Sequence, residues 1–340
     1  MPSLSDPLQL GELRLRNRNI VGAMIRNRST GNMPNELNAE YYAQRALGNA
    51  GLIITEGTLI SQQGTEWENI PGIWNRDQIK AWSNVVQAVH EAGGQIFCQP
   101  TAVTDPKELV SLYKNAAQHA KQAGFDGVEV HAGDGYLLHQ FLDSTSNHRT
   151  DRWGGSIENR ARFTLDVVRA LIEVWGYDRV GIKLTPCGGL NDVGMPLEET
   201  IQTYTYLVQQ LDSLPVLYIT LVRDVPRLCP RFEDKSRSTP HDVLETYRHH
   251  VRRPYLFLNA GISISEAEEL LREEKLDAVV FGRLWISHPD LQLRIEYGVP
   301  VDVPIDPTTI LGRSYVDPRR GYVDYPVVVN LLGNCLSPRT

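Results

Sequence analysis

The chain has few cysteines and no long apolar run, and each shortage excludes a class of protein. Its four cysteines, Cys98, Cys187, Cys229 and Cys335, lie far apart and form no metal-type pair. We therefore expect no metal site and a reduced intracellular compartment. No apolar run approaches the roughly 20 residues that cross a bilayer, and the N-terminus lacks the charged and apolar segments of a secretory signal. These absences predict a cytoplasmic protein without a membrane partner.

Clusters of positive charge are also missing. The chain has 34 Lys+Arg against 41 Asp+Glu, a net charge of -7, and its longest basic runs are Arg252-Arg253 and Arg319-Arg320. Binding to nucleic acid requires clustered positive charge, so we expect no such partner. No Gly/Ser linker divides the 340 residues, which favours a single domain. Nothing in the sequence indicates an oligomeric state.

Short apolar runs instead alternate with longer amphipathic segments. Eight such alternations predict a (β/α)8 TIM barrel rather than a doubly wound sheet. We expect 1–18 to form an N-terminal rim segment, 19–298 the barrel and 299–340 a C-terminal extension. The predicted strands are Asn19–Met24, Leu52–Ile60, Gln95–Gln99, Val128–His131, Val180–Leu184, Val216–Leu221, Tyr255–Asn259 and Ala278–Phe281. The clearest predicted helices are Arg76–Ala92, Pro106–Ala123, Ser156–Trp175, Pro196–Leu211 and Ser263–Glu274, the last with Ser265 and Glu268 as its capping box.

Three hydrogen-bonding side chains follow the fourth predicted strand, where a barrel places its chemistry. His131, Asp134 and Tyr136 are separated by two glycines, which allow a sharp turn into one cavity. The imidazole can donate to a developing oxyanion and the phenol can deliver a proton. The alternative is an ordinary loop in which His131 caps backbone groups and Tyr136 packs.

Glycines also end the last two predicted strands. Gly261 follows the seventh, and Gly282-Arg283 follows the eighth. Barrels commonly bind phosphate between these two loops, where glycine allows close backbone approach and arginine binds the anion by two hydrogen bonds. The alternative is a rim salt bridge for Arg283.

Taken together, these motifs resemble the Old Yellow Enzyme family of FMN-dependent ene-reductases, from Leu8 to Pro326. The matching motifs are Thr55-Glu56-Gly57-Thr58, Pro71-Gly72-Ile73-Trp74, 124–131, Gly135-Tyr136-Leu137-Leu138, Gln140-Phe141-Leu142, 151–163, Phe281-Gly282-Arg283, His288-Pro289-Asp290-Leu291 and 321–326. The resemblance implies FMN across the barrel mouth, reduced by NAD(P)H, with hydride passing to the β-carbon of an α,β-unsaturated carbonyl substrate.

The resemblance also assigns roles to individual residues. His131 becomes one of two residues that hold the substrate carbonyl, Tyr136 the proton donor to the α-carbon, and Tyr322 a residue lining the substrate pocket. The FMN contacts that it implies are Ile25, Gly57, Gln99, Lys183, Gly261, Gly282 and Arg283, the last three at the phosphate.

Several of these positions depart from the family pattern. Ile25 replaces a threonine whose hydroxyl faces the flavin, and Lys183 replaces an arginine, which keeps the charge but loses the planar fork. Asp134 replaces the asparagine or histidine that completes the carbonyl-binding pair, and an ionised carboxylate cannot donate. The next helix follows Gln99 closely, at Asp105-Pro106, which predicts a more open or differently shaped pocket.

These departures leave two other functions open beside ene reduction or isomerisation of an unsaturated carbonyl compound. One is a flavin-independent cyclase or isomerase of specialised metabolism that uses His131, Asp134 and Tyr136 for acid-base chemistry. The other is a non-catalytic protein that binds a ligand or partner.

Overall fold

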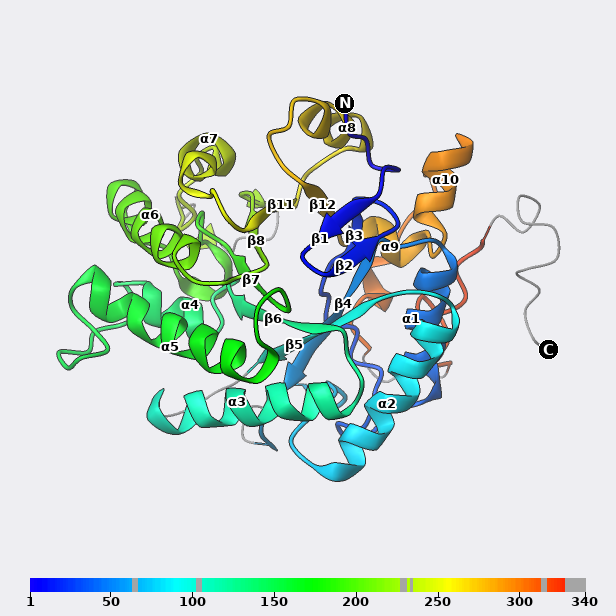
Figure 1. The fold of residues 1–340 in the computed structure, drawn as a ribbon, viewed down its shortest axis with the longest axis horizontal. Helices are drawn as coiled ribbons and strands as arrows, with labels where there is room; N and C mark the ends of the chain where they lie inside the picture. Colours follow the sequence, from blue (N-terminus) through cyan, green and yellow to red (C-terminus); the bar gives the residue numbers. More distant parts are fainter. Residues whose placement is uncertain (63–66, 102–105, 227–230, 233–234, 313–316, 328–340) are drawn as a thin grey trace.

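Eight parallel strands close into a barrel surrounded by helices, which confirms the predicted (β/α)8 fold (Figure 1). The computed structural model describes residues 1–62, 67–101, 106–226, 231–232, 235–312 and 317–327. The barrel order is β11-β12-β3-β4-β5-β6-β7-β8. Its strands are β3 (Asn19–Val21), β4 (Leu52–Leu59), β5 (Ile96–Thr101), β6 (Gly127–Ala132), β7 (Val180–Leu184), β8 (Tyr218–Val222), β11 (Tyr255–Asn259) and β12 (Ala278–Phe281).

The helices follow the amphipathic segments of the sequence, and several begin at capping residues. Asn75 caps α2 and Ser156 caps α5, each accepting a hydrogen bond from the backbone three residues on. Helix α8 is capped by Ser263, which accepts from the Glu266 amide, so the predicted Ser265–Glu268 capping box is wrong. The helices are α1 (Glu36–Leu47), α2 (Arg76–Glu91), α3 (Pro106–Gln122), α4 (Leu137–Leu142), α5 (Ile157–Trp175), α6 (Leu197–Asp212), α7 (Val243–Tyr247), α8 (Ile264–Arg272), α9 (Arg283–Ser287) and α10 (Leu291–Tyr297), with 3-10 turns at Leu190–Asp192, Arg248–His250 and Pro307–Thr309.

Two layers of apolar side chains hold the barrel together. Outward-facing strand residues such as Val128 and Val130 pack against the helices, whereas Glu129 and His131, two residues apart on the same strand, face inward. Strands β1 (Leu8–Leu10) and β2 (Leu13–Leu15) form an antiparallel hairpin. Its leucines pack in one apolar cluster with side chains of the barrel strands, such as Phe97, Tyr218 and Phe257. This hairpin covers the N-terminal end of the barrel and leaves the C-terminal end for a site.

Two further segments lie outside the barrel alternation. A short hairpin, β9 (Arg231–Phe232) with β10 (Lys235–Ser236), follows β8. The chain after Gly298 returns to the C-terminal end of the barrel, where Val301 and Ile310 line the central cavity. Within the described residues, no helix combines the length and the apolar character that a membrane span requires.

Candidate active site

A large cavity opens at the C-terminal ends of the barrel strands, and all eight strands or the residues just after them contribute to its wall. Its volume of about 1370 Å³ exceeds the roughly 300–1,000 Å³ typical of a site for one small ligand. Apolar residues of the C-terminal segment, Val301, Ile305, Ile310 and Leu311, complete the wall. The cavity therefore has room for a cofactor and a substrate side by side.

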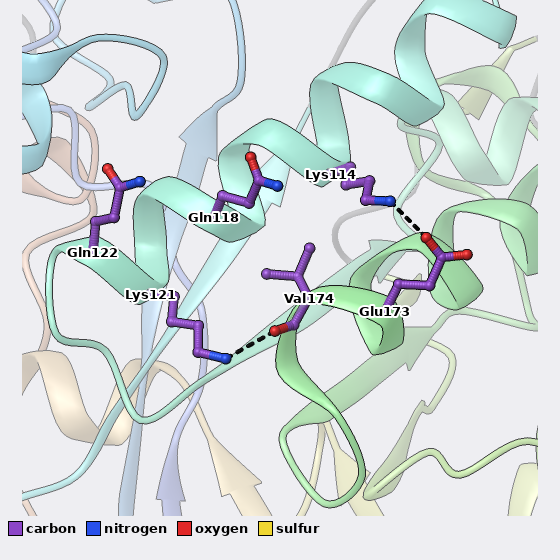
Figure 2. Close-up of a pocket in the computed structure, with 6 residues that line it drawn as sticks. All are labelled: Lys114, Gln118, Lys121, Gln122, Glu173 and Val174. Atoms are coloured by element: carbon purple, nitrogen blue, oxygen red, sulfur yellow. Dashed lines mark hydrogen bonds and ion pairs between the residues drawn. The ribbon is translucent and has the colours of Figure 1, made fainter.

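A smaller pocket of about 610 Å³ lies on the outer surface between α3 and α5 (Figure 2). Lys114 pairs with Glu173 at 2.6 Å, and the Lys121 ammonium donates to the Val174 carbonyl at 2.9 Å. Because its charged side chains already bind each other or the backbone, and no strand end reaches it, this pocket offers no chemistry.

The structure brings ten of the eleven residues singled out by sequence to the wall of the large cavity. They are Ile25, Gly57, Gln99, His131, Asp134, Tyr136, Lys183, Gly261, Gly282 and Arg283.

Tyr322 is the exception, and its predicted place in the substrate pocket is corrected by the structure. Its side chain is fully buried, stacks on Tyr41 with ring centroids 4.3 Å apart and accepts a hydrogen bond from Asn38 at 3.0 Å. The Arg26 guanidinium lies 5.1 Å from its ring centroid. These contacts hold Tyr322 between α1 and the barrel's first loop, away from the cavity.

The turn after β6 is what brings the imidazole and the phenol together. Asp134 and Gly135 both have positive φ, 55° and 73°, a left-handed conformation that glycine adopts at little cost and that aspartate tolerates. The Asp134 amide donates to the Thr185 hydroxyl at 3.2 Å, and the Asn191 side chain donates to the Asp134 carbonyl at 2.8 Å. The turn places the rings of His131 and Tyr136 5.2 Å apart at 51°.

Asp134 lies between two basic side chains. Its Oδ2 is 3.8 Å from His131 Nε2 and 3.8 Å from Lys183 Nζ, while its Oδ1 accepts from the Thr185 hydroxyl at 2.8 Å. Burial alone would raise the pKa of Asp134, but Lys183, His131 and the Thr185 hydrogen bond outweigh burial and lower it. The carboxyl group is therefore ionised at neutral pH.

Burial lowers the pKa of His131 from 6.5 to about 4, with smaller contributions from Lys183 and His139 and against the opposing effect of Asp134. His131 is therefore neutral at neutral pH. Nε2 is the ring nitrogen that lies 3.8 Å from the Asp134 carboxylate, and the negative charge favours the tautomer with hydrogen on that nitrogen.

The depressed pKa of His131 predicts a pH dependence of stability. The unfolded chain takes up a proton as the pH falls below 6.5, whereas folded His131 resists it down to about 4. The free energy of unfolding should therefore fall over this range by up to about 3 kcal/mol. Urea unfolding at about pH 7.5 and about pH 4.5 measures the loss, and the His131→Asn protein should lose less. Equal losses in the two proteins would show that His131 is not held neutral.

A second set of polar groups surrounds Gln99, which lines the cavity. The Gln99 amide nitrogen donates to buried Glu129 at 2.7 Å, and the Tyr218 hydroxyl donates to the other Glu129 oxygen at 3.0 Å. Since its nitrogen is engaged, Gln99 offers its amide oxygen, a hydrogen-bond acceptor, to a ligand, and Lys183 in the same cavity wall offers a donor. An acceptor and a donor in one cavity suit the pyrimidine edge of a flavin, which carries one ring N–H beside carbonyl oxygens.

Other observations also fit FMN. Among the described residues, the hydroxyl of Thr101 and Nδ1 of His131 are buried without a hydrogen-bond partner, and both residues line the cavity. Gly261, with φ of 65°, and Arg283, which is exposed, lie at the β11 and β12 ends predicted to hold the phosphate. The part of the chain that is described holds no group of three or more His, Cys, Asp or Glu side chains suited to a metal ion.

Sequence reasoning missed Glu129 as a polar group of the site, and it placed Arg26 at a strand end without predicting its burial. Glu129 is a lone carboxylate in an apolar strand, two residues before His131 and so on the same face, and that spacing was the available signal. Arg26 is fully buried, and nothing in its local sequence indicates burial. The short connection after Gln99 is as expected, since α3 begins at Pro106; residues 102–105 lie outside the described residues.

Comparison with known proteins agrees with this geometry. The model of the NADH:flavin oxidoreductase / NADH oxidase family matches residues 3–104 and 101–302. NADP-dependent oxidoreductase lnbE of Aspergillus flavus is 36% identical, with 96% of each chain covered. The solved structure of morphinone reductase is 34% identical with a TM-score of 0.87, covering 98% of this chain and 99% of its own. An old yellow enzyme homologue from Zymomonas mobilis is 31% identical with a TM-score of 0.86, covering 96% and 99%. The chain therefore belongs to the NADH:flavin oxidoreductase / NADH oxidase family, as an FMN-dependent, NAD(P)H-using ene-reductase of the Old Yellow Enzyme type.

Proposed function

We propose that this enzyme reduces the C=C bond of an α,β-unsaturated carbonyl compound between His131 and Tyr136. The observation that carries the proposal is the placement of these two rings, 5.2 Å apart, in one cavity with the groups that fit a flavin. When bound, FMN accepts hydride from NAD(P)H and supplies it to the β-carbon of the alkene.

The side chains have separate tasks in this proposal. Neutral His131 donates its Nε2 hydrogen to the carbonyl oxygen, where negative charge develops as the β-carbon is reduced. The hydroxyl of Tyr136, which is half-buried, gives its proton to the α-carbon. Val301, Ile305 and Ile310 cover the cavity with apolar surface and limit the access of water to the reacting carbons.

The residues that would hold FMN lie in the wall of the same cavity. Gln99 would accept from the flavin ring and Lys183 would donate to it, while Gly57 would permit close approach and Ile25 would offer only apolar contact. Gly261, Gly282 and Arg283 would bind the phosphate. Lys183 is a single point donor rather than a planar guanidinium, so it would offer the flavin ring fewer directed hydrogen bonds than an arginine. Its ammonium also lies 3.8 Å from the Asp134 carboxylate.

The flavin-independent cyclase or isomerase considered from sequence is not favoured. The matched family and the relatives named above are reductases or oxidoreductases. The non-catalytic alternative has no support either, because the polar groups of the cavity remain in place.

Anaerobic spectroscopy of the purified, FMN-loaded protein tests the proposal. NADPH or NADH should bleach the flavin absorbance, and 2-cyclohexenone should then restore it with formation of cyclohexanone in equal amount. Excluding oxygen matters, since oxygen also restores the colour. A flavin that neither nicotinamide bleaches, or that the enone leaves bleached, would contradict the proposal. Conversion of an enone by flavin-free protein would instead support the cyclase or isomerase.

We also propose a cytoplasmic location and a small-molecule substrate as the enzyme's partner. Cys98 and Cys187 are buried and form no disulfide, which suits a reducing compartment.

A further inference from the structure

We propose that Asp134 makes the site select unsaturated carbonyl compounds that carry a hydrogen-bond donor, a hydroxyl or an amine, on the carbon next to the carbonyl. The inference rests on the proposed ene reduction and names the class of substrate. It follows from what a carboxylate can bind and from the contacts of the two Asp134 oxygens.

Asp134 lines the cavity, and its two carboxylate oxygens have different contacts. Oδ1 accepts from the Thr185 hydroxyl at 2.8 Å. Oδ2 lies 3.8 Å from both His131 Nε2 and Lys183 Nζ, beyond hydrogen-bond length for either. The Asp134 side chain is 23% exposed, in contrast to 7% for His131 and 9% for Lys183. Oδ2 therefore has space for a donor that a ligand brings.

The backbone holds this oxygen in place. The Asp134 amide and carbonyl are both hydrogen-bonded, to Thr185 and Asn191, in a left-handed turn. Rotation of the carboxylate away from the cavity would break the bond from Thr185. A substrate consequently meets a fixed acceptor rather than a side chain that can turn aside.

The polarity of this acceptor disfavours a simple enone. An ionised carboxylate only accepts hydrogen bonds, and so does a carbonyl oxygen, so the two repel each other when they are close. A substrate that places a carbonyl oxygen on His131 and an O–H or N–H on Asp134 satisfies both. Because His131 Nε2 and Asp134 Oδ2 are 3.8 Å apart, two side-by-side hydrogen bonds suit heteroatoms on neighbouring carbons.

Lys183 limits how much of this selection comes from charge. Its ammonium lies 3.8 Å from Oδ2 and partly balances the negative charge of the carboxylate, so the substrate does not have to be a cation. Selection comes from hydrogen-bond direction, and a neutral hydroxyl is sufficient. The asparagine or histidine implied by the family resemblance would instead present a donor, so Asp134→Asn is a test substitution of nearly equal shape.

Binding of two planar probes to the FMN-loaded protein tests the polarity without turnover. Benzamide both donates and accepts hydrogen bonds, benzoate only accepts them, and their shapes are alike. The dissociation constant, followed by the change in flavin absorbance, should be at least about tenfold lower for benzamide than for benzoate. Asp134→Asn should remove most of that preference. Benzoate binding to the unmodified enzyme as tightly as benzamide would overturn the inference even if the variant failed to fold.

Turnover gives a second, independent comparison. The kcat/KM for 6-hydroxycyclohex-2-enone should exceed that for 2-cyclohexenone by about tenfold, and Asp134→Asn should reverse the order. Asp166→Asn, on the outer helix α5 where it pairs with Arg169, is the matched control and should leave the ratio unchanged. If neither enone reoxidises the flavin of the unmodified enzyme, the proposed function fails. If both do and Asp134→Asn leaves their ratio unchanged, only the selection by Asp134 fails.

Discussion

Replacing Tyr136 with phenylalanine should slow reoxidation of the reduced flavin by 2-cyclohexenone about 10²- to 10⁴-fold. The variant keeps the ring that lies 5.2 Å from His131 and loses only the hydroxyl, which is the proposed proton donor to the α-carbon. Bleaching of the flavin by NADPH needs no proton from Tyr136 and should proceed at the unmodified rate. The effect is therefore confined to one half of the reaction.

Anaerobic stopped-flow measurement separates the two halves. Tyr297→Phe, an exposed tyrosine at the end of α10, removes the same hydroxyl from a site outside the cavity and should alter neither rate. Equal slowing of both halves by Tyr136→Phe would indicate damage to the flavin site instead of loss of a proton. An unchanged reoxidation rate would remove Tyr136 from the mechanism.

Replacing Arg26 with alanine should lower the free energy of unfolding by about 3–5 kcal/mol, because it removes one partner from a buried set of charges. The side chain is fully buried and donates to the carbonyls of Ile310 and Gly321 at 3.0 and 2.6 Å. Its guanidinium also lies 5.1 Å from the ring centroids of both Tyr41 and Tyr322. Its loss leaves buried carbonyl oxygens unpaired and releases the segment that covers the cavity.

The decrease in the free energy of unfolding caused by Arg26→Ala should depend on pH, because Arg26 interacts with the ionisable side chain of Glu56. Burial raises the pKa of Glu56 to about 7, although two backbone amides and the charges of Arg26 and Arg28 act in the opposite direction. Since Arg26 stabilises the ionised carboxylate, the deficit of Arg26→Ala should be larger at pH 8, where Glu56 is ionised, than at pH 5, where it is protonated.

Urea unfolding at these two pH values measures the deficit. Arg169→Ala removes an exposed partner of Asp166 on α5 and should cost less than about 1 kcal/mol at either pH. A deficit for Arg26→Ala as small as that of this control would mean that the C-terminal segment is held by its other contacts.

Much of the fold could be predicted because barrel strands are covered on both faces and so form nearly continuous apolar runs. Strands β7, β11 and β12 begin and end at the predicted residues. The cap of α8 was misassigned because Ser263 and Ser265 both precede a glutamate by three residues, and local sequence does not distinguish them. In the structure Glu266 pairs with Arg223 and Glu268 binds the Leu4 amide, so contacts from distant segments use both glutamates.

The sequence by itself determined the barrel, because apolar periodicity is a local property. It also brought His131 and Tyr136 to one site, because they are separated by only four residues in a glycine-containing turn. Tertiary structure alone decided the position of Tyr322, since its stacking partner Tyr41 comes from the other end of the chain. It also decided the charge of Asp134, because the Lys183 ammonium and the Thr185 hydroxyl reach it from the neighbouring strand and its loop. Ionisation depends on the distance between charges in space, and spacing along the chain does not report that distance.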